Sequence, residues 1–268
     1  MTVRFLLSRW LPALPLLVFA GALPARAEEF SVLVSPPRFE EAAQQGTTVR
    51  QVLEITNVSE SPVRLGIRTA DWLLEPDGGV EFFYPLQPGS CRPWVGLEAA
   101  EIQLPANGKR RFRFEVAVPN DAPVGECRFA LMLEGDPQVV RGTAVPIAGR
   151  IGVIVYVAVG DAQPRLSVLS YHADTIDGRM LPVLRVRNDG NAHGRLDGMV
   201  NGVDAQGRRF AFVPNGLPLM PGDIRTVVLT PQGDAPDAPP PTLAFPVRIQ
   251  GQLEYAGGRL GIDGTFGQ

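Results

Sequence analysis

The two cysteines are the residues best able to form a covalent or metal-binding site. Cys91 and Cys127 are the only cysteines in the chain, and a tetrahedral metal site needs two further ligands. His172 and His193 are the only histidines, and their separation from each other and from the cysteines does not match that of metal ligands. They are expected at turns or the surface. We therefore predict no metal site. A disulfide and a pair of buried free thiols remain as alternatives, and an oxidising compartment favours the disulfide.

Catalytic motifs are missing from the sequence. It contains no G-x-S-x-G, Gly-rich phosphate loop or H-E-x-x-H pattern, and neither histidine lies beside a nucleophile motif. Acid pairs such as Glu40-Glu41 have the pattern of solvated surface. Asp71-Trp72 is compatible with a sugar-stacking site, although tryptophans in β-sandwiches more often fill the core. The sequence thus predicts no enzyme, no cofactor and no catalytic residue.

Arg38 is the candidate for anion binding. It lies in Ser35-Pro36-Pro37-Arg38, just after an apolar run, and the two prolines stiffen the backbone before it. A guanidinium held in this way can grip a carboxylate through two parallel hydrogen bonds. The alternative is an arginine that only solvates its strand, and residue chemistry alone does not separate the two.

The run 144–159 is the longest β pattern. Apolar β-branched residues recur on one parity of it, at Val145, Ile147, Ile151, Val153, Val155, Val157 and Val159. Such a strand extends about 50 Å, whereas a domain of 100 residues is only about 35 Å across. An apolar edge that its own domain leaves uncovered is suited to pairing with another chain. The alternative is a bulge or loop at Pro146 or Gly149 that splits the segment and leaves its apolar residues in the core.

The candidate residues lie in or beside short β-rich runs, which are separated by Pro, Gly, Asn and Asp. Gly (29) and Pro (26) form about a fifth of the 268 residues, which disfavours long helices. Strands are predicted at 30–35, 49–57, 63–72, 80–84, 101–104, 110–118 and 127–134, and after a break at 160–164 at 166–171, 181–187, 196–203, 208–213, 224–230 and 245–255. The predicted fold is all-β, with two immunoglobulin-like β-sandwich domains in tandem, at 28–160 and 165–268. The long edge strand 144–159 ends the first domain.

The amino terminus predicts export. Arg4 and Arg9 precede the apolar run 11–23, and Ala25-Arg26-Ala27 has the pattern of a cleavage site, so residues 1–27 are interpreted as a signal peptide. No other apolar run reaches the roughly 20 residues that span a membrane, so no membrane insertion of the mature chain is expected. The net charge of −3 argues against nucleic acid as a partner.

The order of these features resembles the periplasmic pilus-assembly chaperones over most of residues 30–160. The matching pieces are the Arg38 segment, Val52-Leu53-Glu54-Ile55-Thr56-Asn57, Asp71-Trp72, Leu104-Pro105-Ala106 before Arg111-Phe112-Arg113-Phe114, and the strand ending Val155-Tyr156-Val157. The resemblance implies a periplasmic, two-domain protein without a cofactor that caps pilus or related surface subunits by lending them a strand. An outer-membrane usher is the further partner to consider.

The resemblance also implies site residues. By position, Arg38 matches the arginine that binds the carboxyl terminus of the subunit, and Val145, Ile147, Ile151 and Val153 match the side chains that are lent. The family's second anchor, a lysine on the last strand, is replaced here by Val153 or Ile154, and the nearest basic residue is Arg150. The alternative function is an immunoglobulin-like structural or adhesive module of the envelope, with a self-contained core.

Overall fold

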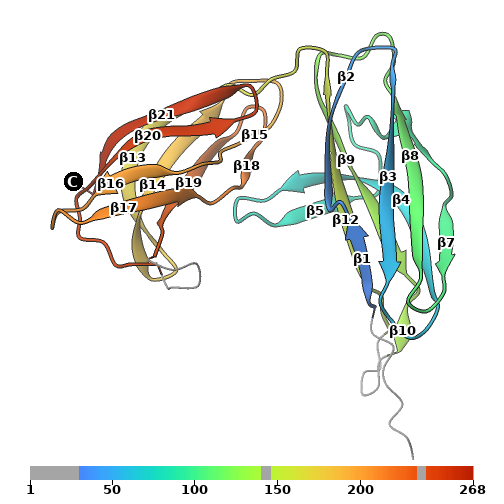
Figure 1. The fold of residues 1–268 in the computed structure, drawn as a ribbon. Coiled ribbons are helices and arrows are strands. Elements are labelled where there is room, and N and C mark those ends of the chain that lie inside the picture. The colour runs from blue at the N-terminus through green and yellow to red at the C-terminus, as the bar shows by residue number, and fades with distance from the viewer. Residues whose placement is uncertain (1–29, 140–145, 234–239, 268) are drawn as a thin grey trace, which may run out of the picture.

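The computed structural model describes residues 30–139, 146–233 and 240–267, and almost all of their regular structure is β (Figure 1). Strands β1 to β12 build a first domain and β13 to β21 a second. The prediction of two β-sandwiches in tandem is therefore confirmed. The proposed signal peptide, 1–27, and Val145 lie outside the described residues. No helix among the described residues is long and apolar enough to cross a membrane.

The first domain packs two sheets against each other. One sheet has the order β1-β3-β8-β6, and the other has the order β2-β12-β9-β4-β5, with β7 beside β4. The strands of the first sheet are β1 (Val32–Ser35), β3 (Thr48–Asn57), β8 (Lys109–Ala117) and β6 (Val95–Leu97), and those of the second are β2 (Arg38–Ala43), β12 (Arg150–Val159), β9 (Gly125–Gly135), β4 (Val63–Leu74), β5 (Val80–Phe83) and β7 (Glu101–Leu104). A single 3-10 turn, η1 (Arg92–Trp94), precedes β6.

Alternating side chains decide which sheet faces meet. On β8, Phe112 and Phe114 are buried, whereas Arg111 and Arg113 between them are exposed. The buried rings pack in one core cluster with Phe129 of the opposite sheet. Because successive side chains of a strand point to opposite faces, this pattern gives each sheet one face for the core and one for solvent.

The first strand changes sheets at Pro36-Pro37. β1 pairs antiparallel with β3, whereas β2 pairs parallel with β12. Proline lacks the N–H that a ladder needs, so consecutive prolines end one ladder and let the chain cross to the other sheet. β2 begins only at Arg38, opposite Ile154, and the beginning of β12 is therefore left without it.

The single long strand expected at 144–159 is corrected to two strands, β11 (Pro146–Ile147) and β12. β11 pairs with β10 (Gln138–Val139), and β12 pairs with β9. The register shifts by one residue between these ladders, because the two residues Asp136 and Pro137 lie opposite Ala148 alone. A proline cannot donate to a ladder, and such a two-against-one arrangement is a β-bulge. The break adjoins Gly149, one of the two positions at which the sequence left a bulge or loop open as the alternative.

The second domain is a seven-stranded sheet in the order β13-β14-β19-β17-β16-β20-β21, folded so that its first and last strands lie side by side (Figure 1). Its strands are β13 (Leu166–Ile176), β14 (Arg179–Asn188), β16 (Val200–Val203), β17 (Arg209–Pro214), β19 (Ile224–Pro231), β20 (Val247–Tyr255) and β21 (Gly258–Phe266). Leu184, Phe212 and Phe266 are fully buried in its core. A short pair, β15 (Gly194–Arg195) and β18 (Pro218–Leu219), lies at the end near the first domain.

Candidate binding site

The first four residues of β12, 150–153, have a neighbouring strand on one side only. β9 pairs with the whole of β12, whereas β2 pairs with it only from Ile154 onward. The carbonyl of Gly149 accepts a hydrogen bond from the end of β9 at 3.0 Å, and backbone groups alternate sides along a strand. The N–H and C=O groups of Arg150 and Gly152 therefore face an open edge, which no strand of the described chain covers. We call residues 150–153 the open edge of β12.

The apolar side chains of this segment do not share one environment. Ile147 on β11 is 54% exposed. Ile151 is half-buried, and Val153 is fully buried among core residues of both sheets. The sequence assigned both to the face that fills a partner. The structure places the Val153 side chain in the protein's own core, so this side chain is not free to enter a partner.

A groove of about 770 Å³ runs beside the open edge. Its apolar lining comes from Phe30, Val32, Val63, Ile147 and Ile151, and its charged lining from Arg64, Asp136 and Arg150. Val32 belongs to the first sheet and Ile151 to the second, so the groove lies at the seam between the two sheets. This seam is open because β1 and β12 are not paired with each other.

Arg38 lies where the open edge ends. It is the first residue of β2 and is paired with Ile154. Its Nε lies 2.6 Å from Oε1 of Glu40, and its side chain is 45% exposed. A guanidinium carries five N–H donors in a planar fork, so this ion pair leaves donors for a second anion. The segment that the sequence singled out thus brings a cation to one end of the open edge.

His193 joins the two domains at the same place. Its ring stacks on Tyr156 of β12, with 3.9 Å between ring centroids. Glu126 of β9 accepts hydrogen bonds from the backbone N–H of His193, at 2.9 Å, and from its ring. His193 lies in the loop between β14 and β15, and its side chain is only 9% exposed because it packs against the first domain. Burial raises the pKa of Tyr156 to about 12.

Arg195 brings a second cation to this region. With Glu40 and His193 it lines a cleft of about 590 Å³ between the domains. Its Nη1 donates to a backbone carbonyl of the second domain, and its Nε is buried without a hydrogen-bond partner among the described residues. Burial lowers the pKa of Arg195, and the positive charge of Arg38 lowers it further. The two guanidinium groups, one from each domain, are thus within electrostatic reach of each other.

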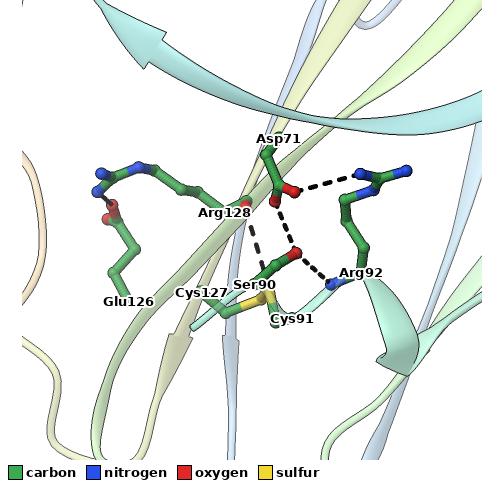
Figure 2. The surroundings of a disulfide bond; sticks show 7 residues. All are labelled: Asp71, Ser90, Cys91, Arg92, Glu126, Cys127 and Arg128. Atoms are coloured by element: carbon green, nitrogen blue, oxygen red, sulfur yellow. Dashed lines mark hydrogen bonds and ion pairs between the residues drawn. A yellow bond between two sulfur atoms is a disulfide. The ribbon is translucent and has the colours of Figure 1, made fainter. Parts of the chain in front are cut away.

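A disulfide joins β9 to the loop after β5 (Figure 2). Cys91, in the loop after β5, is bonded to Cys127 of β9, with 5.9 Å between their Cα atoms. Beside it, the buried carboxylate of Asp71 accepts hydrogen bonds from Ser90 Oγ at 2.6 Å and from Arg92 Nη1 at 3.2 Å. The predicted pairing is therefore present in the structure. It ties the loop after β5 to the strand that carries the contact with His193.

The β4–β5 hairpin makes a second contact between the domains. Arg225 of β19 donates to the backbone carbonyls of Leu74, at 2.8 Å, and Glu75, at 3.0 Å. Asp223 holds this guanidinium at 2.9 Å. Figure 1 shows the hairpin reaching toward the second domain. The domains therefore meet through His193, through Arg225 and through Met220, which shares a buried cluster with Trp72 and Tyr156 of the first domain.

No protein-family model matches the sequence, and no curated protein matches it. Solved structures are similar to it at low identity. The alignment with the YadV chaperone covers 88% of this chain and 99% of the YadV chain, at 10% sequence identity and with a TM-score of 0.48. A chain from the complex of the SafA pilin with the SafB chaperone of Salmonella enterica matches 88% and 98% at 12% identity, TM-score 0.45. The CupB2 chaperone of Pseudomonas aeruginosa matches 88% and 100% at 14% identity, TM-score 0.43. A likeness at these values does not identify a function, so function is inferred from the site.

Proposed function

We propose that this protein is a periplasmic chaperone that binds pilus or related surface subunits by strand addition. The observation that carries the proposal is the open edge of β12 beside an apolar groove. A strand of the subunit that adds to this edge gains main-chain hydrogen bonds from Arg150 and Gly152, and alternate side chains give specificity. No bond is made or broken in the subunit, so neither catalysis nor a cofactor is needed.

Ile147 and the preceding Val145 are the side chains lent to the subunit in this proposal. Ile147 is exposed and lies on the same parity as Ile151. An exposed isoleucine that continues an open edge is an aggregation hazard unless a partner covers it. Ile151 and Val153 contribute the position of their backbone, since their side chains pack in the first domain.

Arg38 is the proposed anchor for the carboxyl terminus of the subunit. A carboxylate between Arg38 and Arg195 accepts charge-assisted hydrogen bonds from one or both guanidinium groups. It also relieves the repulsion between the two cations. Arg195 thereby takes the place of the lysine that the sequence lacks on β12.

Export supports the periplasmic location. A signal peptide at 1–27 directs the chain out of the cytoplasm, and the Cys91–Cys127 disulfide suits an oxidising compartment.

Copurification tests the proposal. The full chain is expressed in a bacterial periplasm together with a small β-rich surface subunit encoded near it, and the purified protein is examined for a 1:1 complex. The expected result is a stable complex that protects the subunit from proteolysis. A folded chaperone that captures no such subunit favours the alternative, a structural or adhesive envelope module.

A further inference from the structure

We propose that the groove beside the open edge receives an apolar side chain of the bound strand, and that Phe30 occupies this place until the strand binds. This inference rests on the proposed function, because it concerns the strand that adds to β12. It assigns a role to a residue outside the lent segment and outside the cleft.

The pleat of the sheet fixes where the side chains of an added strand point. Residues directly opposite each other on neighbouring strands point to the same face. Ile151 lines the groove and packs against the core of the first domain. The residue of the added strand opposite Ile151 therefore points into the groove, and its two neighbours point to the outer face.

The lining of the groove selects an apolar side chain at that position. Val32, Val63 and Ile151 offer no hydrogen-bond partner from their side chains. Two of the three charged residues of the lining, Arg64 and Asp136, are paired with each other at 3.5 Å. A polar side chain placed against Val32, Val63 and Ile151 loses water without gaining a partner from them, which costs free energy, whereas an apolar one is stabilised by burial.

The Phe30 ring already fills part of the groove, where it packs against two glycines. A β carbon at Gly149 would lie 2.1 Å from Cγ of Phe30, and one at Gly135 would lie 2.7 Å from its Cδ2. Only residues without a side chain leave room for the ring. Phe30 precedes the first ladder pair, in which Val32 lies opposite Asn57, so the ring can leave this position without breaking the pairing of β1.

A peptide-binding cycle tests this inference. The probe is a short synthetic peptide of alternating threonine and leucine, compared with the same peptide carrying alanine in place of its central leucine. Removal of a competing plug raises the population able to bind, so Phe30→Ala is expected to bind the leucine peptide about tenfold more tightly than the unchanged protein. The affinity for the alanine peptide is expected to change much less.

Filling the groove gives the opposite expectation. Val63→Phe adds bulk to the lining without altering β12, and we expect it to weaken the leucine peptide about tenfold or more. Val203→Phe makes the same change at an exposed position of the second domain and serves as the matched control. Thermal melts of each variant show whether the domain remains folded.

The outcomes separate the inference from the function on which it rests. Arg150→Pro removes an N–H from the open edge and tests strand addition, and Arg150→Ala, which keeps that N–H, controls for the loss of the side chain that lines the groove. If Arg150→Pro abolishes peptide binding while Phe30→Ala and Val63→Phe leave the affinity unchanged, the groove inference is overturned and strand addition stands. If Phe30→Ala lowers both stability and affinity, Phe30 is a core residue and not a plug. If the unchanged protein binds neither peptide, both ideas are overturned.

Discussion

At the scale of single residues, a substitution of Arg38 should change subunit binding without changing the stability of the fold. Its side chain is 45% exposed and is paired with Glu40, and exposed ion pairs of this kind contribute only about 0–1 kcal/mol to folding. Arg38→Ala should therefore abolish capture of the subunit while the melting temperature stays nearly unchanged. Copurification and a thermal melt measure the two effects. Arg50→Ala, which removes another exposed ion pair, is the control, and equal loss of binding and stability in Arg38→Ala would make Arg38 structural.

Tyr156 carries a prediction about pH. Burial raises the pKa of its hydroxyl from 10.0 to about 12 in the folded protein. A raised pKa contributes stability that is fully present below the unfolded value and is lost as pH rises through the folded value. The free energy of unfolding should thus fall between about pH 10 and pH 12. Denaturation at several alkaline pH values measures it, and Tyr156→Phe should flatten this part of the profile. An identical profile in the variant would show that another group is responsible.

Residue-level prediction succeeded where the local chain determines the chemistry. The predicted export and the cysteine count were sufficient to pair Cys91 with Cys127. His193 and Arg195 were missed, because their positions depend on the packing of one domain against the other. Nothing in the residues around Arg195 marks it as a cleft residue.

At the scale of elements, the parity of β11 gives a matched pair of variants. Ile147 is 54% exposed, and its neighbour Ala148 is exposed as well. Ile147→Asp should leave a folded, soluble monomer, but subunit binding should fail. The new carboxylate would be buried without a partner in an apolar groove of the subunit, which costs several kcal/mol. Ala148→Asp should weaken binding much less, since Ala148 lies at the bulge between β11 and β12 and, unlike Ile147, does not line the groove. Circular dichroism and copurification measure both effects, and unfolding of Ile147→Asp would instead place Ile147 in the protein's own core.

Most strands could be predicted because an apolar period of two is bounded by turn residues. β2 was missed, since its Glu-Glu-Ala-Ala sequence has low β propensity and its strand forms by pairing with β12. β21 was missed for a related reason, as its glycines weaken the strand signal. The break before β12 depends on Pro137 of the neighbouring strand, so the pattern within 144–159 alone did not locate it.

At the scale of the whole molecule, the proposed anchor combines Arg38 from the first domain with Arg195 from the second. Its geometry therefore depends on the angle between the domains. Contacts at His193 and at Arg225, and the buried cluster in which Met220 joins Trp72 and Tyr156, hold this angle. The Arg225 contact can be weakened without changing a residue of the open edge.

Arg225→Ala tests this dependence. The Arg225 side chain is 13% exposed, and its loss removes a donor from the carbonyls of Leu74 and Glu75, of which the Glu75 carbonyl keeps the N–H of Gly78. Hydrogen bonds from a charged group contribute about 1.5–3 kcal/mol each, so the contact between the hairpin and the second domain should open. We expect small-angle scattering to show a wider range of domain separations, subunit affinity to fall, and the circular dichroism of the folded domains to remain. Arg187→Ala, which removes an exposed ion pair from β14, is the control. Unchanged scattering together with weakened capture would mean that Arg225 acts on the subunit directly, and unchanged values of both would show that the contacts at His193 and Met220 set the angle without Arg225.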